Sequence, residues 1–97
     1  MASVQFFAEE ALTVSSTSVG FTAATYSNAD YAHVYCTIAD VRVRLDGGAP
    51  TASNGIEMRP GDELILESKD EVSRARFIRD GGTDSTLISH FGGRSST

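Results

Sequence analysis

The amino-acid sequence predicts an all-β domain, a small antiparallel β-sandwich or barrel of about 7–8 short strands. Three observations lead to this fold class. Apolar and polar residues alternate with a period of two in several short runs, as they do in half-buried strands. Clusters of Gly, Pro, Asp and Asn separate these runs and are typical of turns. No run keeps the helical spacing of apolar residues over three turns.

The N-terminal third of the chain is predicted to hold an arm and two short strands. Residues 1–9 form an N-terminal arm or edge strand with an adjacent pair, Phe6 and Phe7. An exposed Phe pair is costly, so we expect it to pack against another surface, with a neighbouring subunit as one candidate. The two short strands lie on weak apolar runs, Leu12 with Val14 and Val19 with Phe21. A loop then ends at residues 28–30.

The clearest strand is predicted in residues 31–38, YAHVYCTI. Alternate side chains should point into the core, namely Ala32, Val34, Cys36 and Ile38. The intervening side chains should lie on the other face, namely His33, Tyr35 and Thr37. β-Branched and aromatic residues at these positions suit a half-buried pleated surface.

The next two strands are predicted in residues 41–45 and 62–68. In the first, Arg42 and Arg44 alternate with apolar residues and therefore share one face. In the second, Ile65 lies between two leucines, which indicates burial on both faces. The segment between them, DGGAPTASNG, has neither a helix nor a Lys-Ser or Lys-Thr pair after it, so it connects strands and does not bind phosphate.

The last two strands are predicted in residues 73–79 and 85–91. Arg74 and Arg76 share one face of the first of these strands. The residues between the strands include Asp-Gly-Gly, which is a hairpin signal. Earlier in the chain, Pro60 and the glycine after it favour a type II turn.

The whole chain is predicted to form one domain. Residues 10–92 are its β-sandwich, preceded by the arm and followed by a flexible C-terminal tail in residues 93–97. A chain of this size buries only roughly 60–65% of its unfolded surface. Cys36 is the only cysteine, so a disulfide within the chain cannot supplement the core. We therefore expect a homo-oligomer, because association is the remaining way to bury more surface.

The residues that could carry chemistry are Cys36, His33 and His90. One Cys and two His are too few for a four-ligand zinc site, and a cupin-like barrel would need more converging His. Both His are expected on a polar sheet face, although the many Ser and Asp residues leave a catalytic triad open. Cys36 is expected inside the core. We predict no enzyme and no catalytic, cofactor-binding or metal-binding residue; convergence of the two imidazoles in a pocket would contradict this prediction.

The charge distribution argues against nucleic-acid and membrane partners. The net charge is −5, whereas electrostatic binding of nucleic acid requires clustered Lys and Arg. The N-terminal residues lack the basic and long apolar regions of a signal peptide, and no segment has about 20 apolar residues. We expect synthesis in a reducing cytoplasm.

Six residues are candidates for binding a protein partner. The two Phe are apolar anchors, and the four Arg could hold acidic patches of a partner through bidentate contacts. The simpler expectation for the Arg residues is cross-strand pairing with acids of this chain such as Glu63, Glu67 or Glu71. The candidates are Phe6, Phe7, Arg42, Arg44, Arg74 and Arg76.

Residues 31–92 resemble a family of small virion proteins of tailed bacteriophages. The shared pattern is a strand ending in R-x-R-x-D-G, then A-P-T, a Gly-containing loop, a P-G-D turn, an F-I-R run and a final G-T-D-S-T-L turn and strand. These are turn and strand patterns, with no catalytic signature. The matching positions are Arg42, Arg44, Asp46, Gly47, Ala49, Pro50, Thr51, Gly55, Pro60, Gly61, Asp62, Phe77, Ile78, Arg79, Gly82, Thr83, Asp84, Ser85, Thr86 and Leu87.

The resemblance implies a structural part of a virus particle, made in the host cytoplasm and located in the virion. The expected role is a capsid decoration or cement protein that binds the major capsid protein or other virion proteins on the outer head surface. A head–tail connector or tail component is the first alternative. A carbohydrate- or receptor-binding module is the second, because aromatic side chains such as Tyr26, Tyr31 and Tyr35 can stack on sugars.

Overall fold

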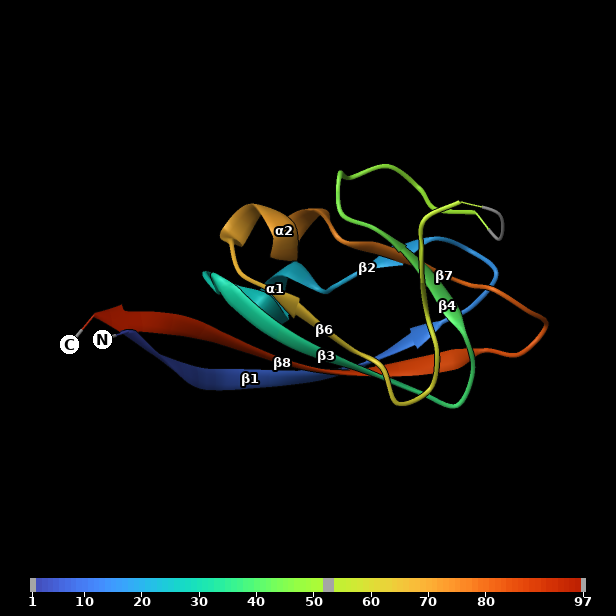
Figure 1. Ribbon diagram of the computed structural model, residues 1–97. Helices are drawn as coiled ribbons and strands as arrows, with labels where there is room; N and C mark the ends of the chain where they lie inside the picture. Colours follow the sequence, from blue (N-terminus) through green and yellow to red (C-terminus); the bar gives the residue numbers. More distant parts are fainter. Residues whose placement is uncertain (1, 52–53, 97) are drawn as a thin grey trace.

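The computed structural model describes residues 2–51 and 54–96, with the side chains of residues 5–51 and 54–93. Strands make up 52% of the chain and helices 11%, so the predicted all-β class is confirmed. Within the described residues, eight strands form two antiparallel four-stranded sheets that pack face to face as a small sandwich (Figure 1).

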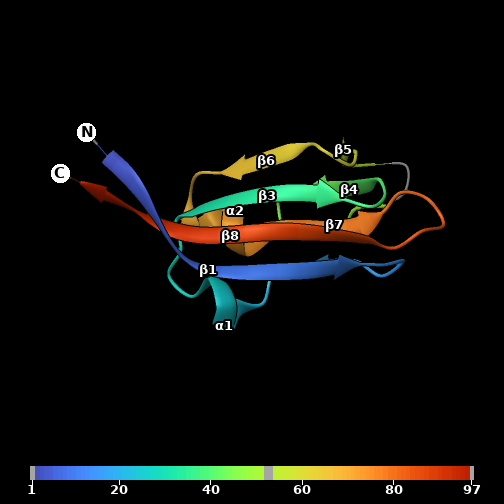
Figure 2. The same ribbon diagram turned by 90° about the horizontal axis from the view of Figure 1, so that it is seen from below.

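The first sheet, called the long sheet below, contains the two longest strands. Its strand order is β1-β8-β3-β6, so β1 and β6 are its edges (Figure 2). The strands are β1 (Ala2–Val14), β8 (Ser85–Ser96), β3 (Tyr31–Thr37) and β6 (Glu63–Leu66). Because β8 pairs with β1 and β3, the first and last strands of the chain lie side by side.

The second sheet, called the short sheet, covers one end of the long sheet. Its order is β2-β7-β4-β5. The strands are β2 (Val19–Gly20), β7 (Arg76–Arg79), β4 (Val41–Arg44) and β5 (Ile56–Met58). Two short helices, α1 (Ala23–Tyr26) and α2 (Lys69–Arg74), lie in connections between strands (Figure 1).

The core lies between the two sheets, and the rings of three phenylalanines in it connect one sheet to the other. The Phe21 ring packs edge-on against Phe77 of the short sheet at 5.1 Å and against Phe91 of the long sheet at 5.0 Å. The alternation predicted in residues 31–38 places Ala32, Val34 and Cys36 in this core, and each is fully buried. Burial of these side chains supplies the main stabilisation, at about 25 cal/mol per Å² of apolar surface.

The ends of the chain differ from the predicted domain boundaries. Residues 1–9 were predicted to be either an arm or an edge strand, and β1 is an edge strand. It does not end at residue 9, however, but continues to Val14. Residues 93–96, where a flexible tail was expected, form the end of β8 and pair with residues 2–5 of β1. The prediction of a flexible tail is therefore wrong. Strands pair through backbone hydrogen bonds, which do not require the apolar pattern by which a strand is recognised in a sequence. Met1 and Thr97 lie outside the described residues.

Two isoleucines expected inside the protein are exposed. Ile65 of edge strand β6 is 41% exposed, so only one face of this strand is buried. Ile38 is 67% exposed because the chain turns at this residue after leaving β3. Its φ is 71°, and the Ala39 N–H donates to the Thr37 carbonyl at 2.8 Å, which closes a γ-turn around Ile38. This turn is strained for a β-branched side chain.

Replacing Ile38 by Gly is expected to raise the free energy of unfolding by about 1 kcal/mol, because Gly adopts positive φ without the steric cost. Urea denaturation measures the change. The control is Ile56→Gly, at an exposed isoleucine in β5 with no positive φ, where the same replacement should destabilise by about 1 kcal/mol. Equal destabilisation by both replacements would contradict the strain at Ile38.

The segment around Arg74 is helical and not extended. Helix α2 begins after Ser68, whose hydroxyl accepts the Glu71 N–H at 3.1 Å, while the Glu71 carboxylate accepts the Glu67 N–H at 2.7 Å. This S-x-x-E spacing is a helix N-terminal signal. Arg74 is the last residue of α2 and Arg76 opens β7, so the prediction that they share a strand face is wrong.

Candidate functional site

The six predicted partner-binding residues lie on separate surfaces. Phe6 and Phe7 belong to β1 of the long sheet, where they are 50% and 56% exposed. Arg42, Arg44 and Arg76 belong to the short sheet, with Arg44 and Arg76 directly opposite each other on β4 and β7. The six residues therefore do not form one site.

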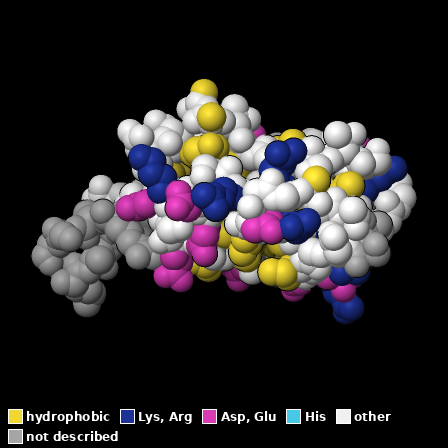
Figure 3. Space-filling model, turned by 90° about the horizontal axis from the view of Figure 1, so that it is seen from above, with side chains coloured by type: hydrophobic (Ala, Val, Ile, Leu, Met, Phe, Trp, Pro, Cys, Tyr) yellow, Lys and Arg dark blue, Asp and Glu magenta, His cyan; other side chains and the backbone are white. Residues whose placement is uncertain are grey.

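The short-sheet arginines have partners within the chain. Arg42 Nε lies 3.4 Å from an Asp80 carboxylate oxygen, and Arg44 donates to both carboxylate oxygens of Asp46, at 3.1 and 2.5 Å. Arg76 donates to the Ser18 carbonyl at 3.4 Å. The face over α2 and the short sheet shows basic and acidic side chains next to one another (Figure 3). The pairs involve Asp46 and Asp80 and not the glutamates expected from the sequence.

The Arg44–Asp46 pair fixes the turn after β4. Hydrogen bonds from the Arg44 guanidinium, followed by one from the Gly48 N–H at 3.1 Å, lower the pKa of Asp46 from 3.8 to about 2. The same hydrogen bonds raise the pKa of Arg44. Because the folded-state pKa of Asp46 is below its ordinary value, the pair stabilises the fold above about pH 4, and this contribution disappears as the pH falls towards 2.

The Arg44→Ala variant is expected to return the Asp46 pKa towards its ordinary value of 3.8, because the hydrogen bonds from the Arg44 guanidinium, which lower this pKa most, are removed. The carboxyl carbon chemical shift of Asp46, followed by NMR from about pH 6 to 1.5, measures the midpoint. Arg59→Ala is the control, since Arg59 pairs with Glu57 at 3.7 Å and not with Asp46. An Asp46 midpoint that is the same in wild type and Arg44→Ala would contradict the assignment.

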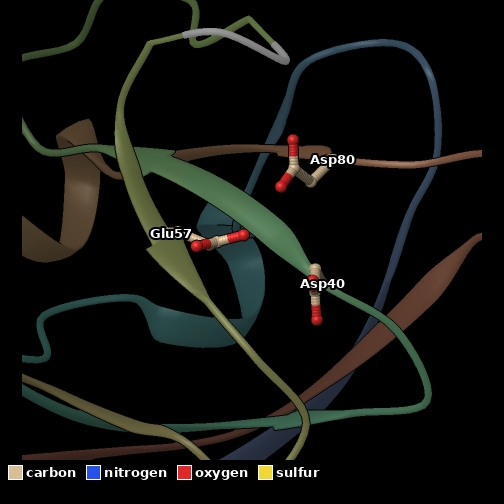
Figure 4. Close-up of side chains that lie close together, drawn as sticks. All are labelled: Asp40, Glu57 and Asp80. Atoms are coloured by element: carbon tan, nitrogen blue, oxygen red, sulfur yellow. The ribbon is translucent and has the colours of Figure 1, made fainter.

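Three carboxylates meet at the edge of the short sheet. Asp40, Glu57 and Asp80 each place one oxygen within 4.8 Å of the others, and Figure 4 shows Glu57 on β5 with the two aspartates near the ends of β4 and β7. Arg42 lies against Asp80 and Arg59 against Glu57, so two cations already offset this negative charge. No local motif reveals the cluster, because the pairing of β4 with β5 and β7 brings the three residues together.

The two histidines converge on the outer face of the long sheet. His33 of β3 and His90 of β8 are direct cross-strand partners. His33 is paired with Glu63, and His90 Nε2 lies 3.2 Å from a Glu9 carboxylate oxygen. This convergence is the observation named above as contradicting a chain without any catalytic, cofactor-binding or metal-binding residue, so the chemistry that this face could support has to be weighed. Their side chains remain about one-third to one-half exposed, as expected for a polar sheet face.

An open pocket of about 420 Å³ surrounds this histidine pair. It is lined by Phe6, Tyr31, His33 and His90. The Phe6 ring centroid lies 5.9 Å from the rings of both Tyr31 and His90, in edge-to-face geometry. Aromatic rings next to imidazole–carboxylate pairs can stack on a flat ligand and hydrogen-bond to its polar groups.

The pocket lacks the third member of a hydrolytic triad. Among the described residues, neither imidazole is hydrogen-bonded to a Ser, Thr or Cys side chain, although each has a carboxylate partner. Cys36 is fully buried in the core, as predicted, and its burial raises the pKa of the thiol. The arrangement on this face therefore supports binding more directly than nucleophilic catalysis.

A row of exposed apolar and aromatic side chains continues from the pocket across the same face. Tyr35 is 40% exposed, and the exposed Ile65 lies directly opposite His33 on β6. Tyr31 and Tyr35 share this face of β3, but Tyr26 belongs to α1 and packs 6.1 Å from the core residue Phe91. We call Phe6, Tyr31, Tyr35 and Ile65, with the two histidines, the aromatic face.

No family model matches this chain, no curated protein matches its sequence, and no solved structure matches its fold. The two helices of the described residues contain four and six residues, and neither is long and apolar enough to cross a membrane.

Proposed function

We propose that this chain is a structural adhesion protein of a tailed-bacteriophage virion, most simply a capsid decoration or cement protein. The aromatic face carries the adhesive part of the proposal, because it presents Phe6, Tyr35 and Ile65 exposed on one side of a rigid sheet. Aromatic and aliphatic anchors grouped in this way are typical of protein interfaces. The resemblance of the sequence to small virion proteins suggests the particle to which such a face would attach.

The residues of the resemblance have structural roles at turns, which supports a scaffold function. Asp62 accepts the Arg59 N–H at 2.8 Å and so closes the turn at Gly61, whose φ is 97°. Arg79 pairs with Asp84 at 2.5 Å across the turn from β7 to β8. These residues determine how the strands connect, and they leave the outer faces of the sandwich free to contact a partner.

Cement proteins stabilise a shell by linkage, since a ligand that binds only the assembled state shifts the equilibrium towards assembly. A face of this kind would be one part of an interface of standard size, about 1,600 Å² in total. No bond needs to be made or broken, so we propose no catalytic residue, cofactor or metal for this function.

Locating the chain on intact virions tests the proposal. Cryo-electron microscopy and quantitative mass spectrometry should find many copies arranged with the symmetry of the head. A few copies at one vertex or in the tail would select the connector or tail alternative. Absence of the chain from purified virions would overturn the assignment to a virion.

A matched pair of isoleucine variants tests the aromatic face. Ile65→Ser is expected to reduce co-sedimentation of the purified chain with capsids, because it places a polar group within the interface. Ile56→Ser alters an isoleucine of similar exposure on the short sheet and should leave binding unchanged. Equal binding of both variants and wild type would exclude this face as the attachment surface.

The pocket of the aromatic face favours a second candidate, carbohydrate binding. Phe6 and Tyr31 offer aromatic faces, and the imidazole–carboxylate pairs offer donors and acceptors for sugar hydroxyls. A glycan array followed by NMR titration would show shifts centred on Tyr31 and His90 that disappear in Tyr31→Ala. An array without binding would remove this candidate.

A further inference from the structure

The outer edge of β1 is unusual in its composition. β1 is an edge strand of the long sheet, and its first seven residues, ASVQFFA, contain neither a charged residue nor a proline. Edge strands that stay unpaired usually carry Lys, Pro or inward-pointing charges, because their free N–H and C=O groups otherwise pair with another chain. These protective residues are absent from the N-terminal half of β1.

The two ends of the chain extend beyond the rest of the long sheet as a two-stranded ribbon. The last pairing of β3 with β8 is Tyr31 with Gly92, so among the strands that the structure describes residues 93–96 pair only with β1. Figures 1 and 2 both show this ribbon projecting past the other strands. A two-stranded ribbon is marginally stable by itself, and pairing with a third strand would stabilise it.

The segment that precedes α1 contacts the other half of β1. The Glu10 carboxylate accepts hydrogen bonds from the Thr22 N–H at 3.0 Å and the Thr22 hydroxyl at 2.7 Å, which holds the start of α1 against β1. The register of β1 on β8 shifts between Phe6 and Ala8, and the bulge there separates this covered half from the free half. The edge available for pairing is therefore residues 2–6.

We propose that residues 2–6 of β1 pair antiparallel with the same residues of a second copy, which joins two long sheets into one continuous sheet. A strand that pairs with itself about a twofold axis forms an isologous interface, the commonest kind in homodimers. The absence of charge in this segment favours a second copy, because no like charges then face each other across the axis.

The adjacent phenylalanines add an apolar contribution to the same interface. Phe6 is the last residue of the pairing segment and Phe7 follows it, and both side chains are about half exposed in the single chain. Strand pairing would bring the neighbouring sheet next to them and cover part of this surface. The proposal does not rest on a role in a virion, since the interface forms between copies of the isolated chain.

Sedimentation equilibrium of the full chain from about 5 to 500 µM tests the pairing, and we expect a reversible dimer with a micromolar dissociation constant. Gln5→Lys puts like charges near the axis and should weaken the dimer about tenfold or more. Ala11→Lys introduces the same charge on the same strand beyond the bulge and should change it little. A wild-type chain that remains monomeric at the highest concentration would overturn the proposal, as would equal weakening by both variants.

NMR on the wild-type dimer gives a test that needs no variant. Mixed labelled and unlabelled chains should show intermolecular Hα–Hα contacts among residues 2–6, and amide exchange there should slow as concentration rises. Association through the aromatic face would instead show intermolecular contacts at Tyr35 and Ile65, which would contradict edge pairing. Contacts between residues 2–6 of the two copies would confirm it.

Discussion

Replacing Phe77 by Ala is expected to lower the free energy of unfolding by about 3–5 kcal/mol, the largest effect of any single replacement considered for this chain. Phe77 is fully buried, pairs across the short sheet with Val19 and Val43, and packs on Phe21 at 5.1 Å. Its removal leaves a cavity and breaks the line of rings that joins the sheets through Phe91. Natural domains have a stability of only about 5–15 kcal/mol, so this variant will be marginally folded.

Urea denaturation at low protein concentration measures this loss, with Phe7→Ala as the control. The control makes the same chemical change at a side chain that is 56% exposed, so it should cost less than about 1 kcal/mol. If Phe77→Ala unfolds at a urea concentration too low for its transition to be fitted, circular dichroism at about 10 °C shows whether it still folds without urea. Similar stability of the two variants would show that Phe77 is not at the centre of the core.

The Gly92→Ala variant is expected to lose about 1–3 kcal/mol of unfolding free energy through overpacking where β1 pairs with β8. A Cβ atom at Gly92 would lie 2.5 Å from the Gln5 carbonyl oxygen and 3.1 Å from the Phe6 Cα. Both are backbone atoms, so rotation of a side chain cannot relieve the overlap. We expect the ribbon formed by residues 2–5 and 93–96 to separate first, because it has no third strand.

Hydrogen exchange of the ribbon amides, together with the melting temperature, measures the effect of Gly92→Ala. Gly81→Ala is the control: its Cβ would meet no atom within 4 Å, so its stability should match wild type or slightly exceed it. Unchanged protection of residues 2–5 in Gly92→Ala would contradict the close approach of β1 to β8. Loss of the dimer in Gly92→Ala but not in Gly81→Ala would connect the ribbon to self-association.

The elements that the sequence predicted well depend on local patterns. Residues 32, 34 and 36 alternate with polar neighbours and are fully buried, since successive side chains of a strand point to opposite faces. The pattern failed at Ile38, because the alternation of buried and exposed side chains no longer applies where the chain leaves the strand. The helix α2 had a local signal in Ser68 and Glu71, but the alternation of Arg74 and Arg76 favoured a strand instead.

The candidate site could be predicted only in part. The sequence placed His33 and Tyr35 on one face of β3 and led us to expect Phe6 to pack against another surface, whereas Phe6 is half exposed in the single chain. It could not place His90 opposite His33, because the register between β3 and β8 joins segments far apart in the chain. The pairing of β4 with β7 likewise brings Asp80 to Arg42, whereas Asp46, the partner of Arg44, lies only two residues further along the chain.

The sequence by itself determined the all-β class, the positions of most turns and the side of β3 that faces the core. Those features follow from the backbone preferences of single residues and from the two-residue period of a strand. Only the tertiary structure decided which strands are neighbours, and with that the histidine pair, the aromatic face and the ribbon of the two chain ends. Strand register is fixed by contacts between distant segments, and these contacts leave no periodic trace in either segment alone.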